Sequence, residues 1–163
     1  MGFEDGGRYI IRNALSGQVL TAAEYDVSSF IGAPVRGLDW QGKDSQQWLL
    51  VQNDTHWYIR NCETGIYLAP QSGHTNDVQD GTRLVCTDGY YDFDIKEQSN
   101  NEYRIYIFDS VRPLNAEFGD FGDGKGEQAY LTAQIDGSRT QLWRFEKVET
   151  PCGPMTHTSL DEA

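Results

Sequence analysis

The sequence predicts an all-β fold built from three repeats of four strands each. Three observations lead to this prediction. A turn motif recurs 48 residues along the chain, and a Gln-x-Trp triplet closes two of the repeats. The chain is rich in glycine, with 17 Gly, and in aromatic residues, with 4 Trp, 9 Tyr and 7 Phe. Long apolar runs at helical spacing are absent. Such a balance favours many short strands joined by tight turns.

The start of the repeat is marked by a strand that runs into a turn. Residues 9–13 read YIIRN and residues 57–61 read WYIRN, and each is followed by a segment of the form Asn-x-x-Ser/Thr-Gly. The Asn side chain can bond its own backbone two residues on, and Gly supplies a positive φ. Both segments are therefore predicted to end a strand in a tight turn.

The end of the repeat is marked by an aromatic residue two positions after a polar one. Gln46-Gln47-Trp48 and Gln141-Leu142-Trp143 share this spacing, and Tyr91-Asp92-Phe93 stands between them with Phe in place of Trp. Units of about 45–50 residues follow. They divide one domain, residues 1–149, into repeats of about 7–52, 53–98 and 99–148.

Short β-rich runs bounded by turn residues, with apolar side chains at period two, predict the strands in order. The expected strands are 8–13, 18–23, 33–40, 46–52, 56–61, 66–70, 82–87, 91–98, 103–108, 112–117, 129–134 and 141–148. Three four-strand units closing on a threefold axis make a six-stranded barrel capped by three hairpins. The predicted fold is a β-trefoil.

The spacing of the Gln-x-Trp triplets resembles the ricin B-type β-trefoil lectins, most of all the small single-domain fungal members. The resemblance covers roughly residues 6–148. The segment 150–163 has no strand pattern and is expected to be a flexible tail. The resemblance implies one shallow sugar site per repeat, with an acid after the second strand, an aromatic platform further on, and a polar residue just before Gln-x-Trp.

Carried onto this chain, the resemblance favours a sugar site in the first repeat, where Trp40 is either a sugar platform or a packed loop anchor. The family's usual Asp and Asn are replaced by Thr21-Ala22 and by Ser45. The predicted sugar-binding residues are Glu24, Asp26, Trp40, Asp44 and Ser45. The weaker candidates are Gln71, His74, Asp88 and Tyr90 in the second repeat, and Asn115, Glu117, Tyr130, Asp136 and Thr140 in the third.

The function that the resemblance implies is a non-catalytic lectin for galactose or N-acetylgalactosamine-type glycans. Two alternatives stay open. One is a lectin-like accessory subunit that has lost sugar binding and rides on a larger protein, like the light chain found with mushroom tyrosinase. The other is a β-trefoil protease inhibitor that presents the loop 70–81 or 117–128. The expected partners are glycans or glycoproteins, with a larger protein partner or a homodimer left open.

Charge and motif content exclude several other classes. The formal net charge is −12 and the pI is about 4.5, which disfavours nucleic acid and anionic membranes as partners. No apolar run reaches the length of a membrane span. The three histidines lack metal-ligand spacing, and neither a nucleophile elbow nor a phosphate loop is present. No catalytic residue is predicted, and Cys86, in an apolar strand, is expected to be buried.

No cofactor or metal is predicted. The acids of the loop 117–128 are irregularly spaced and share it with Lys125, unlike a calcium loop. Cys62, Cys86 and Cys152 are odd in number and widely spaced, so they match neither a disulfide framework nor a zinc pattern. The acidic start of the chain lacks the layout of a signal peptide. We therefore expect a cytoplasmic location.

Overall fold

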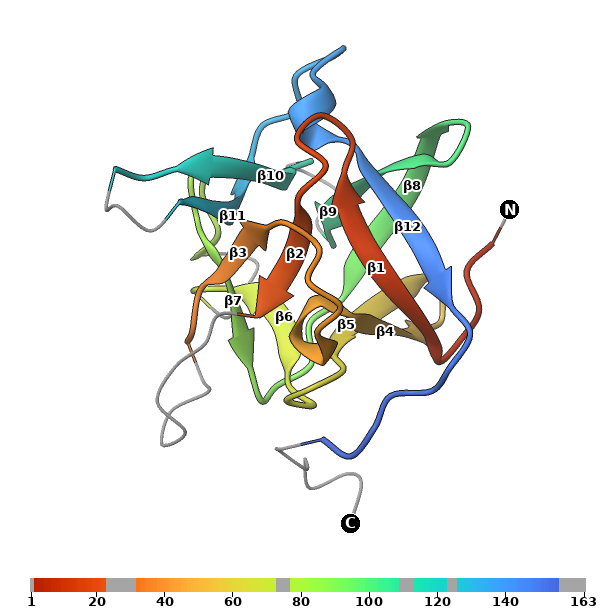
Figure 1. The fold of residues 1–163 in the computed structure, drawn as a ribbon. Helices are drawn as coiled ribbons and strands as arrows, with labels where there is room; N and C mark the ends of the chain where they lie inside the picture. The colour runs from red at the N-terminus through yellow and green to blue at the C-terminus, as the bar shows by residue number, and fades with distance from the viewer. Residues whose placement is uncertain (1, 23–31, 73–76, 109–112, 123–125, 156–163) are drawn as a thin grey trace.

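The computed structural model describes residues 2–22, 32–72, 77–108, 113–122 and 126–155, whose strands form one twelve-stranded sheet (Figure 1). Two short 3₁₀ turns, η1 (Asp44–Gln46) and η3 (Arg139–Gln141), precede the last strands of the first and third repeats. The strands are β1 (Gly7–Asn13), β2 (Val19–Ala22), β3 (Val35–Leu38), β4 (Trp48–Asn53), β5 (His56–Asn61), β6 (Tyr67–Pro70), β7 (Leu84–Thr87), β8 (Phe93–Ser99), β9 (Glu102–Ile107), β10 (Asn115–Asp120), β11 (Glu127–Thr132) and β12 (Trp143–Val148).

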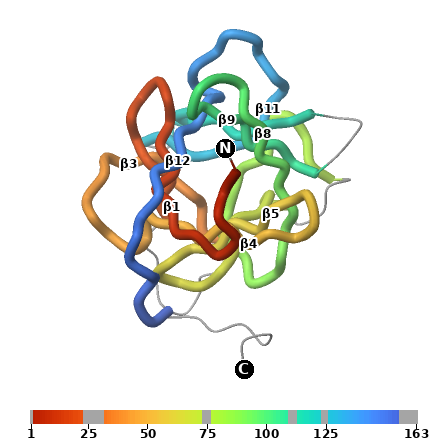
Figure 2. Tube along the Cα trace, turned by 90° about the vertical axis from the view of Figure 1, so that its right-hand side faces the viewer, coloured from red at the N-terminus to blue at the C-terminus, as the bar shows by residue number. Residues whose placement is uncertain are grey.

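The first and last strands of each repeat close into a barrel. Going round it, β1 pairs with β12, β12 with β9, β9 with β8, β8 with β5, β5 with β4, and β4 with β1 again. The second and third strands of each repeat form the hairpins β2–β3, β6–β7 and β10–β11. Figure 2 shows β1 beside β12 and β4 beside β5 on the barrel wall. The predicted β-trefoil is confirmed.

The aromatic residues that end the repeats fill the core. Trp48, Phe93 and Trp143 are all fully buried, as the Gln-x-Trp pattern predicts. Each indole also satisfies its N–H inside the protein: Trp48 Nε1 donates to the carbonyl of Leu20 and Trp143 Nε1 to that of Ala116, both at 3.0 Å. Buried polar groups need such partners. These two bonds also identify Leu20 and Ala116 as equivalent positions of the first and third repeats.

The Asn-x-x-Ser/Thr-Gly turns have the expected mechanism. Asn13 Oδ1 accepts the backbone N–H of Leu15 at 3.1 Å, and Asn61 Oδ1 accepts that of Glu63 at the same distance. The glycines that close the two turns have φ of 75° and 80°. A side chain would be strained in this left-handed conformation, so Gly is required there.

The third hairpin differs from the prediction. Its strands were expected at 112–117 and 129–134, with a loop at 117–128, but cross-strand pairing continues to Asp120 and Glu127. The acids at positions 117, 120 and 127 therefore lie on strands rather than in a loop. Pairing decides this, because Phe118 points into the core and draws β10 onto the barrel despite the weak strand propensity of Gly119 and Asp120.

The expectation that the cysteines lack a disulfide is wrong. Cys62 and Cys152 form one across a sequence separation of 90 residues, with their Cα atoms 5.5 Å apart. The Arg8 guanidinium also donates to the carbonyls of Thr150 and Pro151. Residues 150–155 are thus attached to the barrel instead of forming a free tail, and residues 156–163 lie outside the described chain. The cytoplasmic location stays a prediction, now without support from the cysteines, because disulfides are rare in the cytosol.

Candidate functional site

The three hairpins carry different side chains at one equivalent pair of positions. The residues that follow Leu20 and Ala116 are Thr21 and Glu117. Each faces a partner on the neighbouring strand of its hairpin. The facing pairs are Thr21 with Arg36 in the first repeat, Ala69 with Val85 in the second, and Glu117 with Tyr130 in the third. A carboxylate therefore occupies this place in the third repeat only.

In the third repeat, the Glu117 carboxylate is held by the segment before the last strand. Thr140 Oγ1 donates a hydrogen bond to Glu117 Oε2, and Gln141 Nε2 donates to Oε1 at 3.2 Å. Burial and the neighbouring Glu117 charge raise the pKa of Tyr130 to about 12, so its hydroxyl stays protonated. Glu117, Tyr130 and Thr140 are half-buried, so this polar cluster remains accessible to a ligand.

The side-chain amide of Gln141 is held in place by hydrogen bonds with the buried Arg104 and with the backbone. Its Oε1 accepts hydrogen bonds from the buried Arg104 at 2.6 Å and from the backbone N–H of Ile135 at 2.8 Å. Its Nε2 also donates to the carbonyl of Ala133 at 3.0 Å. Because both ends of the amide are used, its orientation is set, and Nε2 must point toward Glu117. The Gln of Gln-x-Trp therefore positions the acid as well as the backbone.

An exposed polar chain lies next to this cluster. The Tyr106 hydroxyl donates to Gln134 Oε1 at 2.7 Å, and Gln134 Nε2 donates to Asp136 Oδ1 at 3.0 Å. Sequence reasoning named Asn115, Glu117, Tyr130, Asp136 and Thr140 as weaker candidates, and it missed Tyr106, Gln134 and Gln141. Gln134 is equivalent to Trp40, because Gln46 bonds the backbone of Asp39 and Gln41 as Gln141 bonds that of Ala133 and Ile135. Counting back from each Trp does not reveal this, since the third repeat has one more residue in this segment.

The first repeat has a groove at the equivalent place. It has a volume of about 420 Å³ and is lined by Thr21, Ala22, Arg36, Leu38, Gln41, Lys43 and Ser45. Gln46 Nε2 donates to Thr21 Oγ1 at 3.3 Å, as Gln141 does to Glu117. No carboxylate lines this groove among the residues that the structure describes. Its chemistry therefore differs from that of the third repeat although its architecture is the same.

The residues predicted for the first site are not all brought together. Ser45 is buried and lines the groove, while Asp44 makes an ion pair with Arg8 at 2.9 Å. Trp40 is 38% exposed and is not one of the lining residues. Glu24 and Asp26 lie outside the described residues. The involvement of these residues in sugar binding stays a prediction.

The second repeat has no polar side chain at the facing pair of positions, which Ala69 and Val85 occupy. It also has the buried Tyr91 where the other repeats have Gln46 and Gln141. Tyr90, which precedes it, stacks on Tyr58 with ring centroids 4.7 Å apart. Of the weaker candidates, Gln71 and Asp88 are exposed, and His74 lies outside the described residues. Neither residue of the facing pair Ala69–Val85 offers a side-chain acceptor for sugar hydroxyls.

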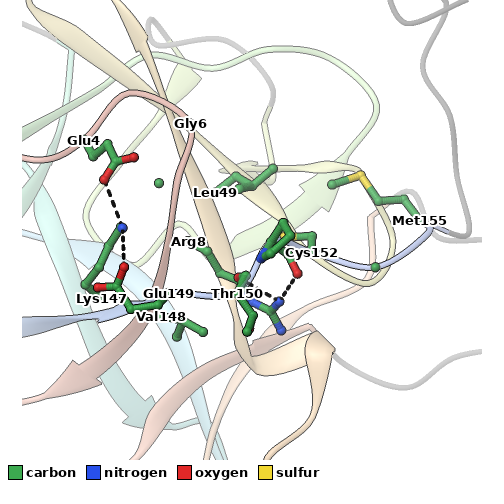
Figure 3. Close-up of a pocket in the computed structure, with 13 residues that line it drawn as sticks. Glu4, Gly6, Arg8, Leu49, Lys147, Val148, Glu149, Thr150, Cys152 and Met155 are labelled. Atoms are coloured by element: carbon green, nitrogen blue, oxygen red, sulfur yellow. Dashed lines mark hydrogen bonds and ion pairs between the residues drawn. The ribbon is translucent and has the colours of Figure 1, made fainter.

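A further cavity, of about 540 Å³, lies between the chain's N-terminal segment and residues 147–155 (Figure 3). Its charged groups already pair with one another: Lys147 lies between Glu4 and Glu149, and the Glu4 carboxylate raises the pKa of Lys147. The Arg8 guanidinium donates to Gln47, Asp44 and two backbone carbonyls. The polar groups here serve the attachment of the C-terminal segment.

Other classes of site find no support in the described part of the chain. No group of three His, Cys, Asp or Glu side chains is placed to hold a metal ion there. No helix among those residues has the length and hydropathy needed to cross a membrane. The buried position expected for Cys86 is confirmed, and burial raises the pKa of its thiol to about 12, so the thiolate nucleophile is disfavoured.

Several solved structures similar to this chain are small proteins that it covers almost entirely. A ricin B-like lectin from Macrolepiota procera, solved in complex with lactose, is 23% identical with a TM-score of 0.74, covering 91% of this chain and all of that one. The Rhizoctonia solani agglutinin is 18% identical with a TM-score of 0.71, covering 91% and 99% of the two chains. The designed threefold-symmetric protein ThreeFoil is 19% identical with a TM-score of 0.73, covering 87% and 99%.

At these identities the structural likeness establishes the fold. Curated proteins include no significant sequence match. Residues 2–87, just over half of the 163-residue chain, match the family described as ricin-type β-trefoil lectin domain-like. The matched region covers the first repeat, with its Gln-x-Trp triplet, and most of the second. The chain therefore belongs to the ricin-type β-trefoil lectin-like family.

Proposed function

We propose that this protein is a non-catalytic lectin that binds galactose or N-acetylgalactosamine-type glycans through its third repeat. The observation that carries the proposal is the Glu117 carboxylate, held by Thr140 and Gln141 beside Tyr130. Family membership and the lactose complex of the Macrolepiota procera lectin support a sugar ligand. Free or protein-bound glycans are then the partners.

The chemistry of this cluster suits a neutral sugar. A carboxylate has about four acceptor positions, and its in-plane oxygens can accept from two adjacent ligand hydroxyls. The Thr140 hydroxyl already donates to Glu117, so its oxygen can accept from a ligand hydroxyl beside the carboxylate. Such a shallow site buries little area, and we expect a dissociation constant of about 0.1–1 mM.

Titration of the labelled protein with lactose and with N-acetylgalactosamine, followed by amide NMR shifts, tests the proposal. In the wild type, shifts should cluster around Glu117, Tyr130 and Thr140. Glu117→Gln keeps the shape of the side chain but removes its charge, and it should weaken binding roughly tenfold or more. Glu127→Gln, a matched change at the far end of the same hairpin, should leave the affinity unchanged. Equal affinity in wild type and Glu117→Gln would refute the assignment.

The first repeat is the second candidate site. Its prediction is based on Glu24, Asp26, Trp40, Asp44 and Ser45, and the exposed indole of Trp40 offers a face on which a pyranose ring can stack. Trp40→Ala should then reduce shifts in residues 19–22 and 35–46 without unfolding the protein. If no glycan shifts any amide, the accessory-subunit hypothesis takes first place. Tight inhibition of a serine or cysteine protease would favour the inhibitor hypothesis.

A further inference from the structure

We propose that the sugar site of the third repeat continues across β9 into a neighbouring cavity, and that its ligand is therefore a glycan of two or more sugar residues. This inference deepens the proposed lectin function and rests on it. The cavity has a volume of about 380 Å³, within the range of about 300–1,000 Å³ that is usual for small-ligand sites. Its described lining consists of His56, Asp94, Lys96, Tyr106, Ile107, Phe108 and Pro113.

Strand pairing joins this cavity to the Glu117 carboxylate. The strand β9 lies between β8 and β10 (Figure 1), and its Tyr106 faces Asp94 of β8 and Asn115 of β10. Residues that face each other across paired strands lie on the same side of the sheet, as do residues two apart on one strand. Glu117 follows Asn115 by two residues. The cavity residues Asp94 and Tyr106 therefore share one side of these strands with Glu117.

Hydrogen bonds connect the two places as well. The Tyr106 hydroxyl donates to Gln134 Oε1 at 2.7 Å, and Tyr106 lines the cavity. Gln134 follows Ala133, whose carbonyl accepts from Gln141 Nε2 at 3.0 Å. The same Nε2 donates to Glu117 Oε1 at 3.2 Å. Gln134 therefore lies next to the segment that holds Glu117, and Tyr106 links it to the cavity.

The side chains between the two ends can bond the hydroxyls of a sugar. Tyr106 directs its proton toward Gln134, so its oxygen can accept. Gln134 Nε2 directs one N–H toward Asp136 and has a second one, and the Asp136 carboxylate has further acceptor positions. Gln134 and Asp136 are exposed, and Tyr106 is half-buried. A glycan that crosses β9 therefore meets both donors and acceptors.

The cavity combines an aromatic face with a charged pair. Phe108 is 46% exposed and stacks on His56, with ring centroids 3.8 Å apart. The apolar C–H face of a pyranose can pack on such a ring. Asp94 and Lys96 form an ion pair with the nitrogen and oxygen 3.4 Å apart, which leaves further acceptor positions on the carboxylate and further donors on the ammonium. These groups suit the hydroxyls of a second sugar residue.

The distance between the two places favours an oligosaccharide over a single sugar. Neighbouring strands lie about 4.8 Å apart, so β8 and β10, on either side of β9, are separated by about 10 Å. This separation exceeds the width of one pyranose ring. A galactose held at Glu117 therefore reaches the cavity through the sugar residues that are attached to it.

Galactose and the trisaccharide galactosyllactose test this inference. The trisaccharide has one terminal and one internal galactose, so it can extend from Glu117 in either direction. In amide NMR titrations of the full chain, galactose should shift residues around Glu117, and galactosyllactose should also shift residues 94–96 and 105–108. The trisaccharide should bind about fivefold or more tightly than galactose, because at least one more hydrogen bond forms. This exceeds the statistical gain from its second galactose unit.

Variants in the cavity decide whether the extension is responsible. Asp94→Asn and Phe108→Ala should each bring the affinity for galactosyllactose close to that for galactose, and galactose binding should stay unchanged. Asp77→Asn, at an exposed position between β6 and β7, is the control for the loss of a carboxylate. Leu15→Ala, at an exposed position after β1, is the control for the loss of an apolar side chain. Unchanged amide positions outside the cavity show that the variants are folded.

The outcomes separate this inference from the lectin function itself. Galactose shifts around Glu117, with no gain in affinity for galactosyllactose beyond the statistical one, would overturn the inference and leave the proposed function standing. Tighter binding of galactosyllactose that neither Asp94→Asn nor Phe108→Ala reduces would do the same. The absence of shifts around Glu117 with either ligand would refute the proposed site, and the inference with it.

Discussion

Among individual residues, Trp48 and Trp143 should contribute most to stability. Both are fully buried, and both donate their indole N–H to a backbone carbonyl of a hairpin strand. Replacing either with Ala leaves a large cavity and an unpaired carbonyl, so we expect a loss of about 3–5 kcal/mol in the free energy of unfolding. Denaturant titration measures it. Trp40→Ala is the control at an exposed indole, and an unchanged midpoint for Trp48→Ala would show that its ring does not support the core.

Glu102 should make stability depend on pH in the acid range. Its carboxylate accepts from Arg139 at 2.6 Å and from Arg144 at 2.9 Å, and the hydrogen bond from Arg139 is the main reason that its pKa lies below the usual value. Because the pKa of Glu102 is lower in the folded than in the unfolded protein, Glu102 adds to the free energy of unfolding above the unfolded pKa of about 4.3. This contribution is lost as the pH falls through the folded pKa.

The matched variant isolates this contribution. Glu102→Gln should be less stable than the wild type at neutral pH, and the difference between the two should shrink below about pH 4.3. Thermal unfolding of both proteins over that range measures it. Glu97→Gln, on the neighbouring strand β8, controls for the loss of a negative charge from a protein that is already acidic. Parallel pH curves for wild type and Glu102→Gln would contradict the assignment.

Among the structural elements, the C-terminal segment should depend on the disulfide for its position. Cys62 follows β5 directly, and its backbone N–H donates to the carbonyl of Gln47, just before β4. The Cys62–Cys152 disulfide therefore attaches residues 150–155 to this part of the first repeat. A disulfide typically stabilises a protein by about 2–4 kcal/mol. Cys152→Ser should lose stability in that range, and Cys86→Ser gives a comparison at the buried free thiol.

Thiol counting provides an independent check of the same bond. Without reductant, the native protein should show no reactive thiol, and the denatured protein should show one, from Cys86. Three thiols in the denatured, unreduced protein would show that the disulfide does not form. Thiol exchange during purification would change the number of free thiols, so the count should be made on protein purified under conditions that block it.

The hairpin β10–β11 should tolerate little change beneath Tyr130. A Cβ at Gly119 would lie 2.6 Å from Tyr130 Cε1, so Gly119→Ala must displace the ring that faces Glu117. We expect weaker binding of lactose with a small effect on folding, because the ring can turn toward solvent. Gly89→Ala, where a Cβ meets nothing within 4 Å, is the control. Unchanged lactose affinity in Gly119→Ala would argue against a role for Tyr130.

At the scale of the whole molecule, the threefold architecture is conserved between the repeats while the site chemistry is not. The facing pair is Glu117 with Tyr130 in the third repeat and Thr21 with Arg36 in the first. In the second repeat it consists of two apolar residues. A chain with one neutral-sugar site cannot gain avidity by itself. Calorimetry at high protein concentration should therefore give one lactose per chain, and a stoichiometry of two or three would contradict the divergence of the sites.

The sequence by itself was sufficient for the fold. Period-two apolar patterns, the two Asn-x-x-Ser/Thr-Gly turns and the Gln-x-Trp spacing predict twelve strands, three repeats and buried Trp48 and Trp143. These features are local, since each strand and turn is encoded within a few neighbouring residues. The third hairpin was misjudged because its outer part owes its strand conformation to pairing rather than to its own residues.

Only the tertiary structure decided which side chains meet. Thr140 reaches Glu117 across 23 residues, Arg8 reaches Asp44 across 36, and Cys62 meets Cys152 across 90. Arg36 acquires its significance from facing Thr21, at the position that Tyr130 holds in the third repeat. Such contacts depend on strand register and barrel closure. A register shift of one residue would turn strand side chains such as Glu117 and Arg36 to the opposite face, and no local pattern in the sequence reports it.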